Sequence, residues 1–366
     1  MRILQINSAR TFAGGERHLA DLANSLQKRS HEVYAALAPR SPLADALNEL
    51  PAENIFRVRM RNALDLGSAN HLARIIRENR IEIVHAHLAR DYTLAAIAAR
   101  KQKGVRLVFT RHLLRPLKKF HRVTFHFADR VIAVSRSVAR SLEAQNLIAQ
   151  NKIRVVLNGV DTERFKLRET LLDQHLLSSN LSASHLVGIT GELLEHKGQE
   201  DFVRAARLIN KRFPDAQFFI AGEDRSKTKE YRIRLESLIT EFNLKNRVHF
   251  TGWLESIAPF LSSLDVFVSA SRTEPFGLAI IEAMACGLPV VATASEGARE
   301  IIEDGLSGKL VPVRDVEAMA KAICSLLADE TEQRRLGENA RCAARERFDI
   351  KRMVDETEAI YYELVA

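Results

Sequence analysis

The sequence predicts an α/β protein made of two doubly wound domains, each with a mostly parallel sheet. Short apolar runs alternate with segments whose apolar residues recur at helical spacing. This alternation occurs in both halves of the chain, and a polar stretch separates them. The length of 366 residues is that of about two domains. Alternating strands and helices place helices on both faces of a parallel sheet.

The first half shows the alternation from its first residues. The apolar run 2–6 predicts a strand, and Gly14-Gly15 opens a helix with apolar residues at helical spacing. Ser41-Pro42 has the residues of a helix start, and Ser135 is a suitable N-cap. A further helix is expected over 88–100. Further strands are expected at 33–37, 81–84, 106–109, 130–134 and 153–157.

The second half repeats the pattern and ends in helices. Its expected strands are 187–189, 217–221, 248–251, 266–269 and 290–292, and its chain is helical after residue 316 with a break near Phe348. We therefore expect an N-terminal domain over 1–168, a linker over 169–184 and a C-terminal domain over 185–346. The final helix, 347–366, is expected to pack back on the N-terminal domain.

Charge is divided unequally between the two halves. Residues 1–168 hold 30 basic and 14 acidic residues, a net charge of +16, whereas the remainder has a net charge of −8. The simple interpretation is mutual attraction between the halves. The functional interpretation is an anionic partner for the basic half.

Basic residues are densest between Arg111 and Arg122. Leucines and Phe120 are interleaved with the cations in this segment, a pattern typical of a helix lying on a membrane surface. An exposed amphipathic helix without a function is the alternative. The candidate membrane or acceptor patch consists of Arg111, Arg115, Lys118, Lys119 and Arg122.

Cysteine and histidine usage indicates neither disulfides nor a metal site. The three cysteines, Cys286, Cys324 and Cys342, form no C-x-x-C pair, and we expect each to be a small buried residue. His85-Ala86-His87 is the best metal-like cluster, but it has no acidic or cysteine partner at ligand spacing. No metal or other cofactor is therefore expected.

The sequence contains no signal of export or membrane insertion. No stretch reaches about 18 apolar residues, the length needed to cross a bilayer, and the start MRILQIN does not resemble a signal peptide. A cytoplasmic protein is expected, with the basic segment on the inner face of the cytoplasmic membrane. An RNA-binding aromatic motif, a zinc finger and a helix-turn-helix signal are missing, so no nucleic-acid partner is expected.

The strongest chemical signal is Glu274-Pro275-Phe276-Gly277-Leu278, followed by Glu282. It comes directly after the apolar strand 266–269. Gly277 allows close backbone approach to a ligand, and the next helix directs unpaired N–H groups toward it. Two carboxylates placed in this way accept hydrogen bonds from several hydroxyl groups. An anionic or hydroxyl-rich ligand fits such a site, although a capping acid and a solvated helical glutamate are the simpler interpretation.

This motif resembles the two-glutamate motif of retaining glycosyltransferases of GT-B fold, which have two Rossmann-like domains. The closest likeness is to glycosyltransferase family 4, the glycosyl transferases group 1. Six further segments resemble the family in the same order, and together they span nearly the whole chain. They are Gly14-Gly15-Glu16, the strand end 83–87, Asn158-Gly159-Val160-Asp161 with Phe165, the stretch from Gly191 to Lys197-Gly198, and Ala221-Gly222. Gly287-x-Pro289 and the following valines also match.

The resemblance implies a role for each matching residue. Glu274 would contact hydroxyls of the donor sugar, helped by backbone N–H groups of Phe276 and Gly277 at the start of the helix from Leu278. Glu282 would hold the ribose, and Lys197 would neutralise the diphosphate. Gly14 and Gly15 would let the first helix approach donor or acceptor. His112 resembles a histidine that the family places beside the donor sugar.

One position departs from the family pattern. Glu192 stands where the family usually has an arginine that helps to hold the diphosphate. A carboxylate at that position repels phosphate unless it is turned away or paired. The mode of phosphate binding is therefore the part of the resemblance that Glu192 puts in question.

The implied activity is transfer of a sugar from a nucleotide-sugar donor to a hydroxyl of a cell-envelope acceptor. This acceptor would be a lipopolysaccharide core, a lipid-linked glycan or a phosphorylated glycan. Transfer would retain the anomeric configuration and need no metal, in keeping with the absence of a D-x-D pair. Two alternatives stay open: a nucleotide-sugar epimerase of the same architecture, and a transferase with a small soluble acceptor.

Overall fold

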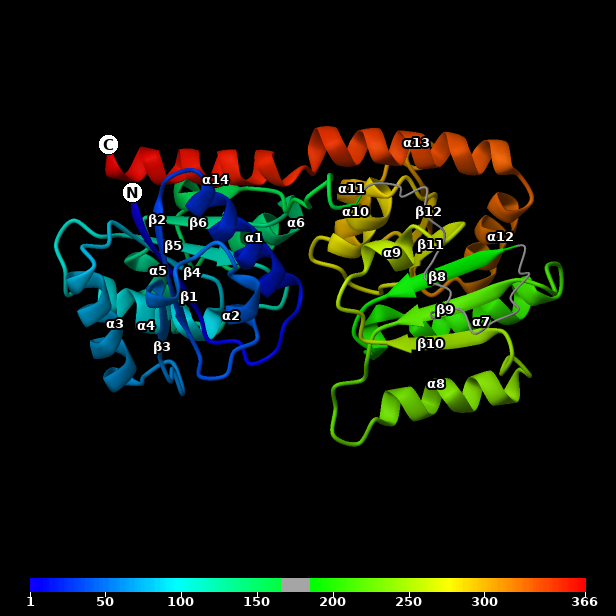
Figure 1. Cartoon of the computed structure of the whole chain (residues 1–366), viewed down its shortest axis with the longest axis horizontal. Coiled ribbons are helices and arrows are strands. Elements are labelled where there is room, and N and C mark those ends of the chain that lie inside the picture. Colours follow the sequence, from blue (N-terminus) through cyan, green and yellow to red (C-terminus); the bar gives the residue numbers. More distant parts are fainter. Residues whose placement is uncertain (166–184) are drawn as a thin grey trace. The chain divides into compact units, whose positions relative to one another are not determined.

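The protein consists of two compact units. The computed structural model describes residues 1–165 and 185–366, so the predicted linker 169–184 lies outside the described residues. Unit 1 comprises Met1–Gly159 and Ile350–Ala366, and unit 2 comprises Val160–Asp349 (Figure 1). Unit 1 thus ends at residue 159 rather than at 168. The reason is that the Val160 N–H donates to the Phe348 carbonyl at 2.9 Å, which ties this segment to unit 2.

Unit 1 contains a seven-stranded sheet whose described strand pairs are all parallel. Its order is β3-β2-β1-β4-β5-β6-β7. The order reverses between β1 and β4, and ligands of doubly wound sheets bind at such a switch point. The strands are β1 (Arg2–Asn7), β2 (Glu32–Leu37), β3 (Ile55–Arg57), β4 (Ile83–Ala86), β5 (Arg106–Arg111), β6 (Arg130–Ala133) and β7 (Ile153–Val155).

The helices of unit 1 bury an apolar stripe against this sheet. They are α1 (Gly14–Lys28), α2 (Leu43–Ala46), α3 (Leu66–Glu78), α4 (Ala89–Ala99), α5 (His121–His126), α6 (Arg136–Ala144) and α14 (Ile350–Val365). Sequence reasoning missed β3 and α3. The three residues of β3 are half-buried or exposed, so they form no continuous apolar run.

The last helix, α14, belongs to the core of unit 1. Met353, Val354 and Tyr361 are buried in one cluster with Leu19 and Leu22 of α1. Figure 1 shows α14, in red, beside the N-terminal elements of this unit. The helix is also anchored by polar contacts, since Glu358 accepts hydrogen bonds from Arg29 at 2.9 Å and pairs with His31 at 2.5 Å. Both apolar burial and ion pairing therefore hold α14 in place.

Unit 2 has a second parallel sheet, of six strands in the order β10-β9-β8-β11-β12-β13. Its strands are β8 (Leu186–Thr190), β9 (Gln217–Ala221), β10 (Val248–Gly252), β11 (Val266–Ser269), β12 (Val290–Thr293) and β13 (Lys309–Val311). Its helices are α7 (Gln199–Asn210), α8 (Glu230–Glu241), α9 (Ala258–Leu261), α10 (Leu278–Ala285), α11 (Glu296–Ile301), α12 (Val316–Leu327) and α13 (Glu330–Arg347). The predicted α/β class with two Rossmann-like domains is confirmed.

Two expectations about individual segments are wrong. The stretch from Arg111 to Arg122 does not form one amphipathic helix, because β5 continues to Arg111 and α5 begins only at His121. Cys342 is exposed on α13, unlike the buried Cys286 and Cys324. Burial raises the pKa of the Cys286 thiol to about 12, so this thiol is unreactive at neutral pH.

Among the described residues, none of the helices combines the length and the apolar character that a membrane span requires.

Candidate active site

The site in unit 2 forms where the adjacent parallel strands β8 and β11 end. Lys197 lies in the segment after β8, and Glu274 lies in the segment after β11. The Lys197 ammonium contacts a Glu274 carboxylate oxygen at 2.7 Å, and the Ser271 hydroxyl donates to the same oxygen at 3.2 Å. Both charged side chains are partly exposed, at 27% and 15%. Two residues that the sequence assigned to one ligand are therefore brought together.

Gly198 permits the close approach of these two segments. Its φ of +73° lies in the left-handed region, and a Cβ on it would lie 2.0 Å from the Ala270 carbonyl oxygen. A side chain at this position would push the segment carrying Lys197 away from the end of β11. Gly198 is also the N-cap residue of α7, so the same residue turns the chain into that helix.

The start of α10 supplies backbone donors beside Glu274. Phe276 is buried and packs edge-on against Phe348, which fixes the loop, and Gly277 at φ +119° caps the helix that begins at Leu278. The first N–H groups of a helix have no partner within that helix and attract anions. Glu282 lies in the second turn of α10, on a half-buried position. The loop thus combines a carboxylate, an ammonium and helix N–H groups.

Glu192 is held by its backbone next to this site. The Gln199 side chain donates to its carbonyl at 3.0 Å, and the carboxylate lies close enough to His196 to act on the pKa of that imidazole. Sequence reasoning overlooked Arg272, which lies two positions before Glu274. Its guanidinium contacts Glu195 at 3.0 Å and Asp201 at 3.5 Å. Those two carboxylates balance its charge, so Arg272 does not replace the arginine that the family has at position 192.

In unit 1, the loop that joins β1 to α1 is fixed by two buried carboxylates. The Ser8 N–H and hydroxyl donate to Asp91 at 2.8 and 2.5 Å. Glu16 accepts from Asn7 at 3.2 Å and from the Ala13 N–H at 3.1 Å. Burial raises the pKa of Asp91 to about 6 and also raises the pKa of Glu16. The glycine loop is therefore a rigid, pre-formed turn.

Gly15 lies directly against His112. A Cβ on Gly15 would be 3.7 Å from the imidazole, which is ordinary van der Waals contact. The structure thus brings together the predicted glycine loop at the end of β1 and the predicted histidine after β5, and Gly14 begins α1 beside them.

His112 belongs to a buried cluster of imidazoles. One ring nitrogen each of His18, His87 and His112 lies within 4.8 Å of the others. Burial lowers the pKa of all three, to about 4 for His18, so the rings are neutral at pH 7. His85 instead pairs with Tyr361 at 2.5 Å and with Thr110 at 2.6 Å. Neutral imidazoles at this separation are able to bind a divalent metal, whereas the sequence singled out only the pair 85–87. Sequence reasoning missed His18, whose only signal was its place one turn into α1.

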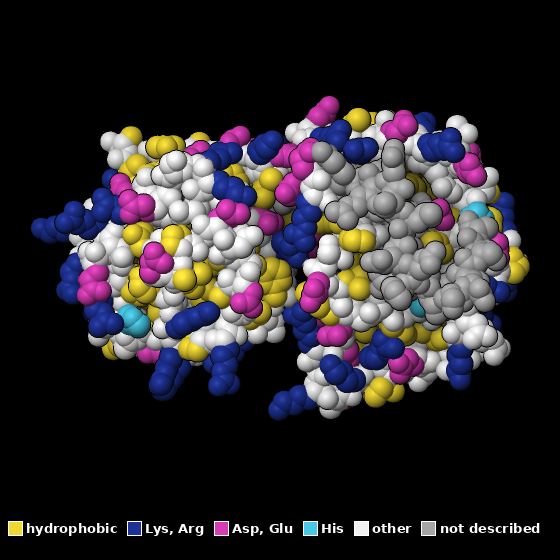
Figure 2. Space-filling view, in the orientation of Figure 1, with side chains coloured by type: hydrophobic (Ala, Val, Ile, Leu, Met, Phe, Trp, Pro, Cys, Tyr) yellow, Lys and Arg dark blue, Asp and Glu magenta, His cyan; other side chains and the backbone are white. Residues whose placement is uncertain are grey.

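The basic segment after β5 is exposed except for its first residue. Arg111 is only 5% exposed, and its guanidinium donates to the Arg115 carbonyl, so it does not belong to a surface patch. Arg115, Lys118, Lys119 and Arg122 are exposed, as are Leu113 and Phe120. On the face of unit 1 that Figure 2 presents, Lys and Arg side chains gather along the lower and left-hand edges.

Both halves of the chain match known families. The family described as "Glycosyl transferases group 1" matches residues 178–342, and "Glycosyltransferase Family 4" matches residues 12–164. A mycobacterial relative is 30% identical over 321 residues, covering 82% of each chain. It is the GDP-mannose-dependent alpha-(1-6)-phosphatidylinositol monomannoside mannosyltransferase of Mycolicibacterium smegmatis. The chain belongs to glycosyltransferase family 4.

Two further proteins are similar to this glycosyltransferase over its whole length. The UDP-Gal:alpha-D-GlcNAc-diphosphoundecaprenol alpha-1,3-galactosyltransferase of Escherichia coli is 26% identical and covers 100% of this chain and 97% of its own. HepE of Anabaena, solved in complex with UDP and glucose, superposes with a TM-score of 0.88 at 23% identity and 99% coverage of both chains. The glycosyltransferase therefore has the GT-B fold.

Proposed function

We propose that this glycosyltransferase moves a sugar from a nucleotide-sugar donor to a hydroxyl of a cell-envelope glycan, with retention of configuration and without a metal. Unit 2 binds the donor, and unit 1 binds the acceptor. The observation that carries this proposal is the Lys197–Glu274 pair at 2.7 Å beside the start of α10. One cation and helix N–H groups meet the diphosphate, and one carboxylate meets the hydroxyls of the transferred sugar.

Each group has a distinct task in the reaction. The bond between the anomeric carbon and the diphosphate oxygen breaks, and negative charge grows on the leaving diphosphate. Lys197 and the N–H groups at the start of α10 stabilise that charge. The acceptor hydroxyl attacks from the same face, and the departing phosphate takes its proton, so the enzyme needs no nucleophile of its own. His112, neutral and against the glycine loop, orients the reacting sugar.

The acceptor assignment is supported by charge and by relatives. Residues 1–168 have a net charge of +16, which favours an anionic acceptor or an anionic surface. The names of the two relatives given above contain phosphorylated lipid acceptors, a diphosphoundecaprenol and a phosphatidylinositol glycoside. We extend that acceptor class to this enzyme. The exposed residues Arg115, Lys118, Lys119 and Arg122 would then hold the enzyme against the inner face of the cytoplasmic membrane.

Glu274→Gln tests the assignment of the donor site. The amide keeps the size of the side chain but cannot balance Lys197 or accept hydrogen bonds through two charged oxygens. We expect turnover to fall at least about a hundredfold while donor affinity changes less than about tenfold, because this contact acts at the reacting sugar. Glu330→Gln, at an exposed position on α13, is the matched control. Turnover within tenfold of the unaltered enzyme would show that the role assigned to Glu274 is wrong. NMR of the product identifies the anomer and tests retention.

A further inference from the structure

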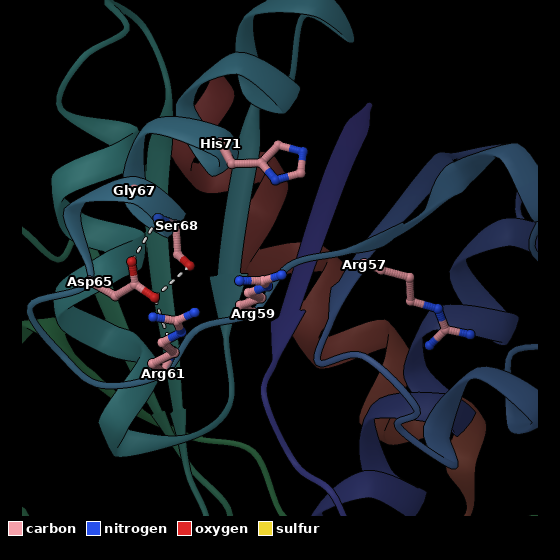
Figure 3. Close-up of a pocket in the computed structure, with 7 residues that line it drawn as sticks. All are labelled: Arg57, Arg59, Arg61, Asp65, Gly67, Ser68 and His71. Atoms are coloured by element: carbon pink, nitrogen blue, oxygen red, sulfur yellow. Dashed lines mark hydrogen bonds between the residues drawn. The ribbon is translucent and has the colours of Figure 1, made fainter.

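A pocket in unit 1 lies outside all the residues assigned so far. It forms where β3 ends and α3 begins, with a volume of about 390 Å³. Figure 3 shows Arg59 and His71 directed toward the same space, with Asp65 and Ser68 joined by hydrogen bonds at one side. The lining residues are Arg57, Arg59, Arg61, Asp65, Gly67, Ser68 and His71.

The pocket is strongly positive. Within the described part of the chain, no carboxylate lies within ion-pair distance of the guanidinium groups of Arg57, Arg59 and Arg61. Asp65 is the one acidic residue in the lining, and backbone and hydroxyl donors already engage it. It accepts from the Ser68 N–H at 3.0 Å, from the Ser68 hydroxyl at 2.9 Å and from the Arg61 N–H at 3.1 Å. Arg59 and Arg61 therefore bring two guanidinium groups to the part of the pocket near Asp65 and His71, Arg57 lines it farther away, and the one carboxylate is committed to holding the loop.

This composition suits a phosphate group. The planar guanidinium presents two N–H donors that match two phosphate oxygens, and arginine keeps its charge at all physiological pH values. The Ser68 hydroxyl and the His71 imidazole add hydrogen-bonding groups on the α3 side. A neutral sugar would leave the charges of three arginines unmatched, whereas a phosphate matches at least two of them.

The pocket is also on the functional edge of the sheet. All strands of this sheet run parallel, so the carboxyl end of β3 lies at the same edge as the ends of β1, β4 and β5. Those ends carry the glycine loop, His87 and His112. Only β2 lies between β3 and β1, and neighbouring strands are about 4.8 Å apart, so the end of β3 is roughly 10 Å from the end of β1, which leads into the glycine loop. One acceptor molecule can span that distance.

We propose that the pocket formed by Arg57, Arg59, Arg61 and His71 binds a phosphate group of the acceptor. This inference rests on the proposed function and narrows the acceptor to phosphorylated molecules. The phosphate is carried either by a soluble phosphorylated glycan or by a lipid headgroup. Leu64 and Leu66, 75% and 62% exposed beside the pocket, are in a position to contact lipid in the second case.

Two double variants of the protein distinguish phosphate binding at this pocket from attraction by positive charge elsewhere on the surface. Arg59→Gln with Arg61→Gln removes two of the arginines that line it. Arg74→Gln with Arg77→Gln removes the same charge from exposed positions of α3 outside the pocket. Circular dichroism checks folding of both. Binding of inorganic pyrophosphate is measured by calorimetry, and binding to phosphatidylcholine vesicles with and without phosphatidic acid is measured by flotation. The donor site is identical in all three proteins, so only differences between them report on the pocket.

The expected result is at least about tenfold weaker phosphate binding in the Arg59/Arg61 variant and little change in the Arg74/Arg77 control. A difference seen with pyrophosphate alone supports a soluble phosphorylated acceptor. A difference seen with phosphatidic acid vesicles supports a lipid headgroup. Equal binding by all three proteins, or equal loss in both variants, overturns the proposal.

Donor binding by the same proteins distinguishes this failure from failure of the proposed function. Thermal shift of the Arg59/Arg61 variant with a panel of UDP-, GDP- and ADP-sugars reports on the donor site, because this variant lacks two of the arginines that line the pocket. If a nucleotide sugar raises the melting temperature while all three proteins bind phosphate equally, only the proposal for the pocket is rejected. No response to any nucleotide sugar in the unaltered protein rejects the proposed function instead.

Discussion

Lys197 and Glu274, 77 positions apart in the sequence, form an ion pair of 2.7 Å at the carboxyl ends of two neighbouring strands. In the proposed reaction these groups contact different parts of one donor, the diphosphate and the sugar. Donor binding then replaces this pair by two new contacts. The ion pair keeps both side chains extended toward the site before the donor arrives, so less side-chain entropy is lost on binding.

Lys197→Ala is expected to weaken donor binding at least about tenfold and to lower turnover as well, because it removes a cation from the leaving diphosphate and leaves Glu274 uncompensated. Calorimetry with the nucleotide sugar and single-turnover rates measure the two effects. Lys245→Ala, at an exposed position in the same unit, is the control and should change neither. Unchanged affinity in Lys197→Ala would place the diphosphate elsewhere.

Glu282→Ala is expected to weaken binding of the free nucleotide while the rate of the saturated enzyme falls less. The ribose is remote from the bond that changes, so its contact contributes about equally to ground state and transition state. Fluorescence or calorimetric titration with the nucleoside diphosphate checks this expectation. Glu338→Ala, exposed on α13, serves as the control. A nucleotide dissociation constant that stays the same in Glu282→Ala contradicts the ribose assignment.

Incubation with EDTA is expected to leave transfer activity intact, since Lys197 and the start of α10 supply the charge that a metal would otherwise provide. The measurement compares initial rates before and after chelation and dialysis. The cluster of His18, His87 and His112 makes this test informative, because neutral imidazoles bind divalent metals. Activity that disappears with EDTA and returns with Zn²⁺ or Mn²⁺ would refute metal independence.

The free energy of unfolding is expected to fall as the pH is lowered from about 6.5 to about 4. Burial depresses the pKa of His18 from 6.5 to about 4. The unfolded chain therefore binds a proton below pH 6.5 that the folded protein does not bind until about pH 4. His18 alone should lower the free energy of unfolding by about 2 kcal/mol between pH ~7.5 and pH ~5. His87 and His112, with depressed pKa values, act in the same direction.

The comparison of the unaltered protein with His18→Gln measures how much of the pH dependence of unfolding comes from His18. Denaturant unfolding at both pH values should show a smaller pH dependence in the variant. The same pH dependence in both proteins would mean that His18 is not kept neutral by folding.

Binding to anionic vesicles is expected to depend on Arg115, Lys118 and Lys119. Each cation near an anionic surface contributes about 1 kcal/mol before salt screening, so replacing all three by glutamine should reduce flotation with phosphatidylglycerol vesicles at low salt. Donor affinity should stay unchanged. A fall in donor affinity would place these residues in the nucleotide site instead.

The control for this variant carries three substitutions in unit 2. Lys211, Lys245 and Lys321 are exposed, and replacing them by glutamine removes the same charge elsewhere. The control should float like the unaltered protein. Negligible flotation of the unaltered protein with both anionic and neutral vesicles would remove the membrane part of the proposal.

The regular parts of the fold could be predicted because their signals are local. Buried strands such as Val266–Ser269 are nearly continuous apolar runs, and α1 begins with two glycines and carries an apolar stripe. The strand Ile55–Arg57 lacked such a signal, since it lies at a sheet edge and is half exposed. The segment after Arg111 misled prediction because a helical pattern of leucines and cations does not reveal that Arg111 completes a buried strand.

The contacts of the candidate site could be predicted where a sequence motif and a contact coincide. Lys197 and Glu274 were assigned to one ligand, and they touch. His18 and Arg272 were missed because their significance depends on neighbours distant in sequence, His112 for the first and Asp201 for the second. The pocket after β3 was missed for a related reason. In the sequence, Arg57, Arg59 and Arg61 are only cations at alternate positions. That they share a pocket with His71 follows from the fold.

The position of α14 in unit 1 has a consequence for biosynthesis. Residues 160–349 are translated between the two segments of unit 1, and at roughly 5–20 residues per second this takes about 10–40 s. During that interval the apolar faces of α1 that α14 covers, including Leu19 and Leu22, have no partner from residues 350–366. Unit 2 is continuous in sequence, so it is able to complete its core first. Newly made chains are therefore most vulnerable to aggregation and to chaperone capture through their earliest residues.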